Sequence, residues 1–224
     1  MLSILQNWSG LLFHALGFTM ALTLWALLFA MLIGLFFALL NVSHSRLLRF
    51  LGTLYVDMVR GVPLIVLAFF VYFGVPQGVN RLMGDGSFRL TALQAGTAAL
   101  AMNCGAYMAE IFRAGIQSID RGQMEAARSL GLSYPRSMVR VVLPQAFRVM
   151  IPSIINQFII TLKDTSILTV IGYPELTNAG KTVVASTFRA LETWAIVGVM
   201  YMVVIVSLSK VAMVVERRLK RGQV

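Results

Sequence analysis

Long stretches without charged residues recur along the chain, and they predict helices that cross a membrane. No Asp, Glu, Lys or Arg precedes Arg46, and Gly61–Asn80 and Leu90–Ala109 are also free of these residues. A helix needs about 20 apolar residues to cross the hydrocarbon core of a bilayer. We therefore expect about five membrane-spanning helices, with approximate ranges 15–40, 60–80, 90–112, 140–163 and 192–215.

The overall composition agrees with this pattern. Hydrophobic residues make up 58% of the 224 residues and charged residues 12%, whereas a soluble domain has about 25% charged residues. The sequence therefore predicts an all-α membrane protein, with residues 1–224 forming a single transmembrane domain. A cleaved signal peptide is not expected, because such peptides begin with a positively charged segment and the first charged side chain here is Arg46.

The basic residues indicate an orientation in the membrane. With five spans, most of the 19 Lys and Arg residues fall on one side. That set comprises Arg46, Arg49, Arg60, Arg113, Arg121, Arg128, Arg136, Arg140, Arg148, Lys210, Arg217, Arg218, Lys220 and Arg221. The positive-inside rule places this set in the cytoplasm, with the N-terminus outside and the C-terminus inside. This flanking role accounts for the net charge of +10 without a nucleic-acid partner.

The stretch from Thr165 to Ala190 allows two interpretations. Its apolar start, Thr165–Gly172, suits membrane depth, and Gly172 and Pro174 then interrupt it. Irregular backbone at that depth occurs only inside protein or beside a water-filled cavity. The stretch is therefore either a broken, partly embedded segment near a solute path or an external helix on the membrane surface.

The predicted cytoplasmic loop 113–148 is the most basic one, and it contains a helix signal. Asp120 can cap the N-terminus of a helix, and Gln123 can complete a capping box three residues later. Gly131 suits the left-handed position that follows a helix C-terminus. The predicted helix, about Arg121–Leu130, is too short to be stable alone in water. It should pack either on lipid headgroups or in a groove of another protein.

The spacing within this loop resembles a known motif. Glu125-Ala126-Ala127 is followed by Gly131, then by Val141 and by Leu143-Pro144. This order resembles the EAA motif of permeases from ATP-binding-cassette (ABC) importers, although that family usually has Ile where Val141 stands. The motif is long, so it is more specific than a short glycine pattern.

Further segments along residues 15–220 resemble permeases for polar amino acids (the HisMQ-type family), especially those for glutamine. These segments are Tyr55–Leu64, Asn103, Ala106–Ile111, Gly115–Ile119, Asn156–Phe158, Lys163–Ser166 and Glu175–Leu176. The resemblance implies the fold of a type I ABC importer permease. It also implies a multi-pass protein of the bacterial inner (plasma) membrane, in contact with membrane lipid.

The same resemblance implies the partners. In that family a short cytoplasmic coupling helix docks in a cleft of a separate ATPase subunit, two permease chains form one pathway, and an extracytoplasmic binding protein delivers the solute. Glu125, Ala126, Ala127 and Gly131 would form the coupling element here. We expect no cofactor in this chain, because ATP and Mg²⁺ would be bound by the ATPase. Gly180-Lys181-Thr182 is not a P-loop, since Glu175 stands where that motif requires glycine.

Polar residues of the predicted spans are candidates for the solute path, because intramembrane polar groups are costly and usually functional. The set comprises Asn103, Asn156, Gln157, Thr161, Lys163 and Asp164. Residues seven apart share a helix face, so Asn156 aligns with Lys163 and Gln157 with Asp164. Alternatively, the amides bond across helices as structural contacts, and Lys163 extends to the outer surface.

The residue at position 157 bears on the solute. Gln157 is neutral and can both donate and accept hydrogen bonds. It favours a neutral polar amino acid such as glutamine, with glutamate, aspartate or basic amino acids as alternatives.

Other functions fit less well. A secondary amino-acid carrier would often contain internal repeats, and we find none. A membrane-embedded enzyme would need a catalytic cluster, but Cys104, His14 and His44 provide neither a metal site nor a disulfide, and we expect no catalytic residue. A scaffold without transport activity is the third alternative.

Overall fold

The computed structural model describes residues 2–84 and 86–221, which form helices and contain no strand. The side chains of Lys220 and Arg221, which belong to the predicted cytoplasmic set, lie outside the described part. The α-helices are α1 (Leu2–Asn41), α2 (Arg46–Arg60), α3 (Leu64–Phe69), α4 (Val75–Met83), α5 (Ala92–Gln117), α6 (Arg121–Ser129), α7 (Tyr134–Ser137), α8 (Leu143–Asp164), α9 (Leu176–Thr187) and α10 (Ala190–Arg221). Two π-helical turns, η1 (Phe70–Gly74) and η2 (Met138–Val142), and the 3₁₀ helix η3 (Thr165–Ile171) connect some of them directly.

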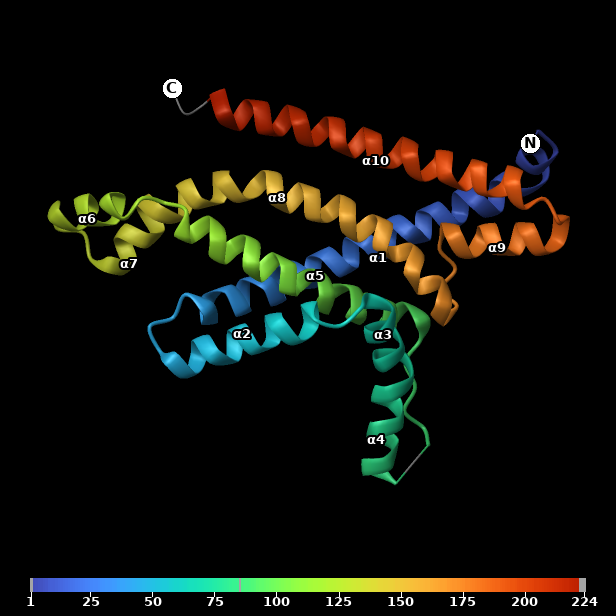
Figure 1. The fold of residues 1–224 in the computed structure, drawn as a ribbon, viewed down its shortest axis with the longest axis horizontal. Helices are drawn as coiled ribbons and strands as arrows, with labels where there is room; N and C mark the ends of the chain where they lie inside the picture. Colours follow the sequence, from blue (N-terminus) through green and yellow to red (C-terminus); the bar gives the residue numbers. More distant parts are fainter. Residues whose placement is uncertain (1, 85, 222–224) are drawn as a thin grey trace.

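The long helices run along one axis of the molecule (Figure 1). Helices α1, α5, α8 and α10 extend between one end, where α6 and α7 lie, and the opposite end, where α9 and the N-terminus lie. Helices α3 and α4 project sideways from this bundle. The arrangement agrees with the predicted all-α membrane fold and places the predicted coupling loop at one end of the bundle.

The predicted spans correspond to α1, α3–η1–α4, α5, α8 and α10. Four helical stretches are long and apolar enough to cross a membrane, namely Leu2–Asn41, Leu64–Met83, Tyr134–Ile171 and Ala190–Arg218. The remaining predicted span, 90–112, corresponds to α5. This helix is 26 residues long but carries many small residues as well as Gln94 and Asn103. Its composition is less apolar because neighbouring helices cover much of its surface.

Two predicted boundaries were wrong. Helix α1 begins at Leu2 rather than near residue 15, since no charge or proline interrupts the first residues. The second span begins at Leu64 rather than near residue 60, because residues up to Arg60 form the amphipathic helix α2, which buries Gly52, Val56 and Val59 and packs against α1 and α5. Helix α2 ends at Arg60, and the break at residues 61–63 precedes α3.

The most extensive helix contact in the fold joins α1 to α5. Glycines let the two backbones approach. A Cβ added at Gly34 would lie 2.5 Å from Cβ of Met108, and one added at Gly105 would lie 2.8 Å from Cγ2 of Ile33. Small residues at such crossings permit the close packing on which helix association in membranes depends.

The segment after α8 is enclosed by protein. Helix η3 continues directly from α8, and its Leu168 and Ile171 are buried in a core with residues of α1, α3 and α5. The chain turns at Gly172, which has φ +77°. Buried Glu175 then caps α9 by accepting hydrogen bonds from the amides of Thr177 and Asn178 at 2.7 and 2.6 Å. This enclosure meets the condition for irregular backbone at membrane depth, and the depth itself stays a prediction.

The α1–α5 contact leads to a first testable prediction. Gly34→Ala should lower the free energy of unfolding by about 1–3 kcal/mol, the usual cost of overpacking. Because Cys104 is the single cysteine and only 1% exposed, labelling by a thiol-reactive dye during heating in detergent reports unfolding.

The matched control is Gly17→Ala, also in α1, where an added Cβ meets no atom within 4 Å. That variant should be neutral or slightly more stable, since alanine favours a helix by about 1 kcal/mol over glycine. Equal melting temperatures for the two variants would contradict a tight α1–α5 crossing.

Candidate functional site

A polar cavity of about 560 Å³ lies where the end of α2, the start of α3, and helices α5 and α8 meet. We call it the solute cavity. Its lining residues are Arg60, Gly61, Val62, Pro63, Leu64, Asn103, Tyr107, Gln157, Ile160 and Asp164. Three of the six residues predicted for the solute path, Asn103, Gln157 and Asp164, therefore lie together.

Helical spacing places these side chains. Gln157 and Asp164, seven residues apart on α8, both line the cavity, which confirms the predicted shared face. Asn103 and Tyr107 are one turn apart on α5. Asn103 and Gln157 are 8% and 5% exposed, so their amide groups have little contact with the surroundings other than the cavity and neighbouring protein.

The other three predicted residues do not line the solute cavity. Asn156 and Lys163 are exposed on another face of α8, in agreement with their own predicted alignment. Thr161 is only 1% exposed and lies inside the helix packing. The predicted ammonium group of Lys163 is therefore not at the cavity, and Arg60 supplies the cation there instead.

Arg60 was missed as a site residue because its charge was counted in the cytoplasmic set that sets the orientation. The structure places it at the C-terminus of α2, where Gly61 is the cap residue and Pro63 starts α3. An arginine directly before a Gly-x-Pro break is a signal that could have indicated it, since such a break often lines a cavity in membrane proteins.

The lining groups match the chemistry of a zwitterion. The Arg60 guanidinium is a bidentate donor for a carboxylate, and the Asp164 carboxylate can accept from an ammonium group. The same cavity is also lined by the neutral groups of Asn103, Tyr107 and Gln157, which can hydrogen-bond a polar side chain. The cavity therefore offers a cation, an anion and neutral hydrogen-bonding groups together.

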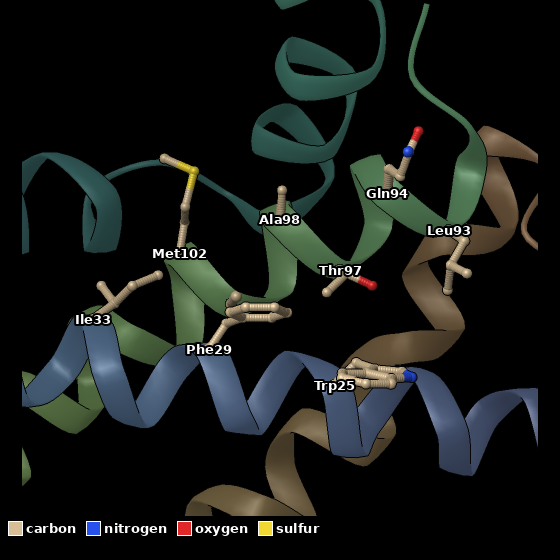
Figure 2. Close-up of a pocket in the computed structure, with 9 residues that line it drawn as sticks. Trp25, Phe29, Ile33, Leu93, Gln94, Thr97, Ala98 and Met102 are labelled. Atoms are coloured by element: carbon tan, nitrogen blue, oxygen red, sulfur yellow. The ribbon is translucent and has the colours of Figure 1, made fainter.

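A separate cavity between α1 and α5, of about 480 Å³, is apolar (Figure 2). Trp25, Phe29 and Ile33 of α1 line it together with Leu93 and Met102 of α5, and the Met102 side chain points away from α1 in Figure 2. The polar side chain of Gln94 points away from the space between the two helices in Figure 2. With so few polar partners, this cavity does not fit a charged or strongly polar solute.

The predicted coupling helix is α6, and its two ends differ in how well they follow the prediction. Asp120 caps it by accepting from the amide of Gly122 at 2.6 Å. The prediction that Gln123 completes a capping box was wrong, because its side chain instead accepts from Nε2 of Gln145 at 3.2 Å. The C-terminal prediction is confirmed, because Gly131 has φ +85°.

The end of α6 is a Schellman motif. The amide of Leu132 donates to the carbonyl of Ala127 at 3.2 Å, and the amide of Gly131 donates to the carbonyl of Arg128 at 2.9 Å. A residue with a Cβ at position 131 would be strained by the left-handed backbone, although an added Cβ would meet no neighbouring atom there.

The side chains of α6 and its C-cap, which include the predicted coupling residues Glu125, Ala126 and Ala127, divide into two groups. Glu125 and Ala126 are exposed, and Leu130 at the C-cap is 85% exposed. Ala127 is buried, and Met124 is half-buried, so this face holds α6 on its own chain near α7 and η2. Glu125, Ala126 and Leu130 therefore belong to the surface of α6 that is available to a partner.

Comparisons with known proteins agree on one family. Residues 30–221 match the family described as binding-protein-dependent transport system inner membrane component. A probable glutamine ABC transporter permease of Bacillus subtilis is 36% identical over 197 residues, which is 88% of this chain and 88% of that one. The glutamine transport system permease of Escherichia coli K12 is 36% identical over 203 residues, covering 89% and 90% of the two chains.

Solved structures give the same result. The crystal structure of an amino acid ABC transporter with histidines contains a chain that is 36% identical, with a TM-score of 0.88 and 97% of each chain covered. A chain of the inward-facing MetNI methionine ABC transporter has a TM-score of 0.78 at 19% identity, covering 93% and 96%. The second likeness concerns the fold alone.

The cap of α6 leads to a second prediction. Asp120→Ala removes the acceptor for the Gly122 amide, and loss of such a cap costs about 1 kcal/mol, or roughly fivefold in the opening equilibrium. Hydrogen–deuterium exchange of the α6 amides should be about fivefold faster, with α9 amides as an internal reference.

Asp120→Asn is the matched control, because asparagine keeps a side-chain oxygen that can accept the same hydrogen bond. Its α6 amides should exchange at close to the wild-type rate. Equal exchange in the alanine and asparagine variants would show that Asp120 does not cap α6.

Proposed function

Because the chain belongs to the family of binding-protein-dependent transport system inner membrane components, we propose that its solute cavity carries polar amino acids across the membrane. The chain is a permease subunit of an ABC importer and spans the membrane several times. The single observation that supports the proposal is the composition of the cavity, where Arg60 and Asp164 offer opposite charges beside the neutral amides of Asn103 and Gln157.

Glutamine is the proposed solute. Arg60 would bind its carboxylate, Asp164 its ammonium group, and Gln157 its side-chain amide through paired donor and acceptor groups. Glutamate and aspartate are the next candidates, and basic amino acids follow because Asp164 is the acid that lines the cavity. Relatives at 36% identity include permeases described for glutamine, which supports the first choice.

The energy source would be a separate ATPase subunit that binds ATP and Mg²⁺. We propose that the exposed surface of α6 around Glu125, Ala126 and Leu130 docks on this subunit, while buried Ala127 and the Gly131 turn fix the position of α6. Movement of α6 would then favour one orientation of the spans over the other, as a two-state transporter requires.

The remaining partners follow from the same assignment. A second permease chain, identical or related, would complete the pathway, and an extracytoplasmic binding protein would deliver the solute. The predicted orientation, with the N-terminus outside and the C-terminus in the cytoplasm, would place α6 on the ATPase side and α9 on the side of the binding protein. The bacterial inner membrane is the proposed location.

Solute selectivity provides the third prediction. Gln157→Glu adds a carboxylate to the solute cavity and should improve arginine binding relative to glutamine by about tenfold, equivalent to about 1.4 kcal/mol. Competition of arginine against labelled glutamine is measured on the solubilised permease–ATPase complex. The binding protein is omitted so that its own selectivity does not enter.

Asn156→Asp serves as the control, because it adds the same charge on the exposed face of α8, away from the solute cavity. It should leave the arginine-to-glutamine ratio at the wild-type value. If Gln157→Glu behaves like Asn156→Asp, Gln157 does not contact the solute.

Coupling provides the fourth prediction. Gly131→Ala forces a Cβ into the left-handed region at a cost of about 1–2 kcal/mol and should disturb the end of α6. In proteoliposomes with the partner ATPase and binding protein, ATP-driven glutamine uptake should fall several-fold. Less ATPase should also be retained during purification of the complex.

Gly84→Ala is matched in backbone strain, since Gly84 has φ +67° and lies at the end of α4, remote from α6. Uptake and ATPase retention should be unchanged in that variant. Equal losses in both variants would attribute the effect to general instability rather than to coupling.

A further inference from the structure

Three polar cavities follow one another from the solute cavity toward α6. The solute cavity shares Arg60 with a cavity of about 320 Å³ that is also lined by Asp57, Glu110 and Arg113. This second cavity shares Asn41, Arg49 and Gln117 with a third, of about 580 Å³, which reaches Arg121 at the start of α6. Arg60 therefore stands at the boundary between the solute cavity and a polar route to the predicted cytoplasmic side.

The contacts of Arg60 connect the two sides of this boundary. Its guanidinium carbon lies 5.1 Å from the ring centroid of Tyr107, which lines the solute cavity. Its Nη1 lies 3.9 Å from Oε2 of Glu110, which lines the second cavity. Arg60 therefore lines both spaces and contacts one residue from each of them.

Glu110 is held firmly on α5. Its Oε1 accepts from Nε of Arg113 at 3.1 Å, and its Oε2 accepts from Nη2 of Arg113 at 2.7 Å. Nη1 of Arg113 in turn donates to Oε1 of Gln117 at 2.7 Å. Bidentate pairing of this kind fixes the carboxylate in one orientation.

The Arg60–Glu110 contact is different. At 3.9 Å it is longer than a hydrogen bond, and Arg60 is the last residue of α2, directly before the break at Gly61. Separation of α2 from α5 at this point breaks a long ion pair and the contact of Arg60 with the Tyr107 ring, and it leaves the Glu110–Arg113 pair intact. It is therefore the contact in this cluster that opens at the lowest cost.

We propose that Arg60 and Glu110 form the cytoplasmic gate of the solute pathway, with Arg113 as the residue that positions Glu110. The gate rests on the proposed function, because it requires that the solute cavity carries amino acids. A solute carboxylate in that cavity competes with Glu110 for the Arg60 guanidinium. Occupancy therefore favours the open gate, since a ligand shifts an equilibrium through its differential affinity for the two states.

The test measures the leakage of glutamine through the permease in the absence of ATP. Proteoliposomes that contain the permease and its ATPase are loaded with labelled glutamine, and efflux is followed without ATP and without binding protein. Arg60→Gln and Glu110→Gln should each raise efflux about fivefold, the effect expected when a partly exposed ion pair is lost. Arg60→Lys retains the positive charge and should remain as tight as the wild type.

Arg46→Gln is the matched control, because Arg46 begins the same helix and lines none of the three cavities. Its efflux should equal that of the wild type. Each variant is also heated with the thiol-reactive dye, and an unchanged melting temperature is expected. A leak that appears only in variants with a lowered melting temperature would contradict the gate, because unfolded protein would then explain it.

The outcomes separate the two proposals. If the wild type drives glutamine uptake with ATP but neither Arg60→Gln nor Glu110→Gln leaks, the gate is wrong and the proposed function stands. If the wild type drives no uptake of any amino acid with ATP, the proposed function fails and the gate fails with it.

Discussion

The close crossing of α1 and α5 is the contact on which the rest of the structure depends. In a bilayer, lipid tails are as apolar as side chains, so helices associate through packing rather than through the hydrophobic effect. Gly34 and Gly105 permit this packing by removing the side chains that would keep the backbones apart. With one face of α5 held against α1, Asn103, Tyr107 and Glu110 are positioned for the polar cavities. The polar residues of α5 thus reach the cavities because its small residues allow the helix to pack closely on α1.

The break between α2 and α3 is the second constraint. Non-helical backbone inside a membrane is tolerated only where it is buried in protein or lines a water-filled cavity, and residues 61–63 line the solute cavity. The same break ends α2 at Arg60 and turns the chain into the projecting α3–α4 segment (Figure 1). One irregular tripeptide therefore both forms part of the cavity wall and brings a guanidinium to its edge.

The sequence predicted those features that depend on local periodicity and turn chemistry. Seven-residue spacing placed Gln157 and Asp164 on one face, and the glycine signal placed the end of α6 at Gly131. The prediction failed where contacts between residues far apart in the sequence determine the position of a side chain. Arg60 was assigned to the cytoplasmic set, whereas it ends the amphipathic helix α2, which packs against α1 and α5. No local rule indicates that a charge at the end of one helix meets Glu110 of another.

The solute cavity and α6 are linked through a single helical unit. The stretch Tyr134–Ile171 includes α7, η2, α8 and η3 without a break. Near one end, Gln145 bonds Gln123 of α6, and toward the other, Gln157 and Asp164 line the cavity. The hydrogen bond between Gln145 and Gln123 thus joins α6 to the helix whose far end forms the α8 wall of the solute cavity. Other walls of that cavity come from α2, through Arg60, and from α5, through Asn103. Because these walls belong to different helices, the cavity can change shape without unfolding any of them.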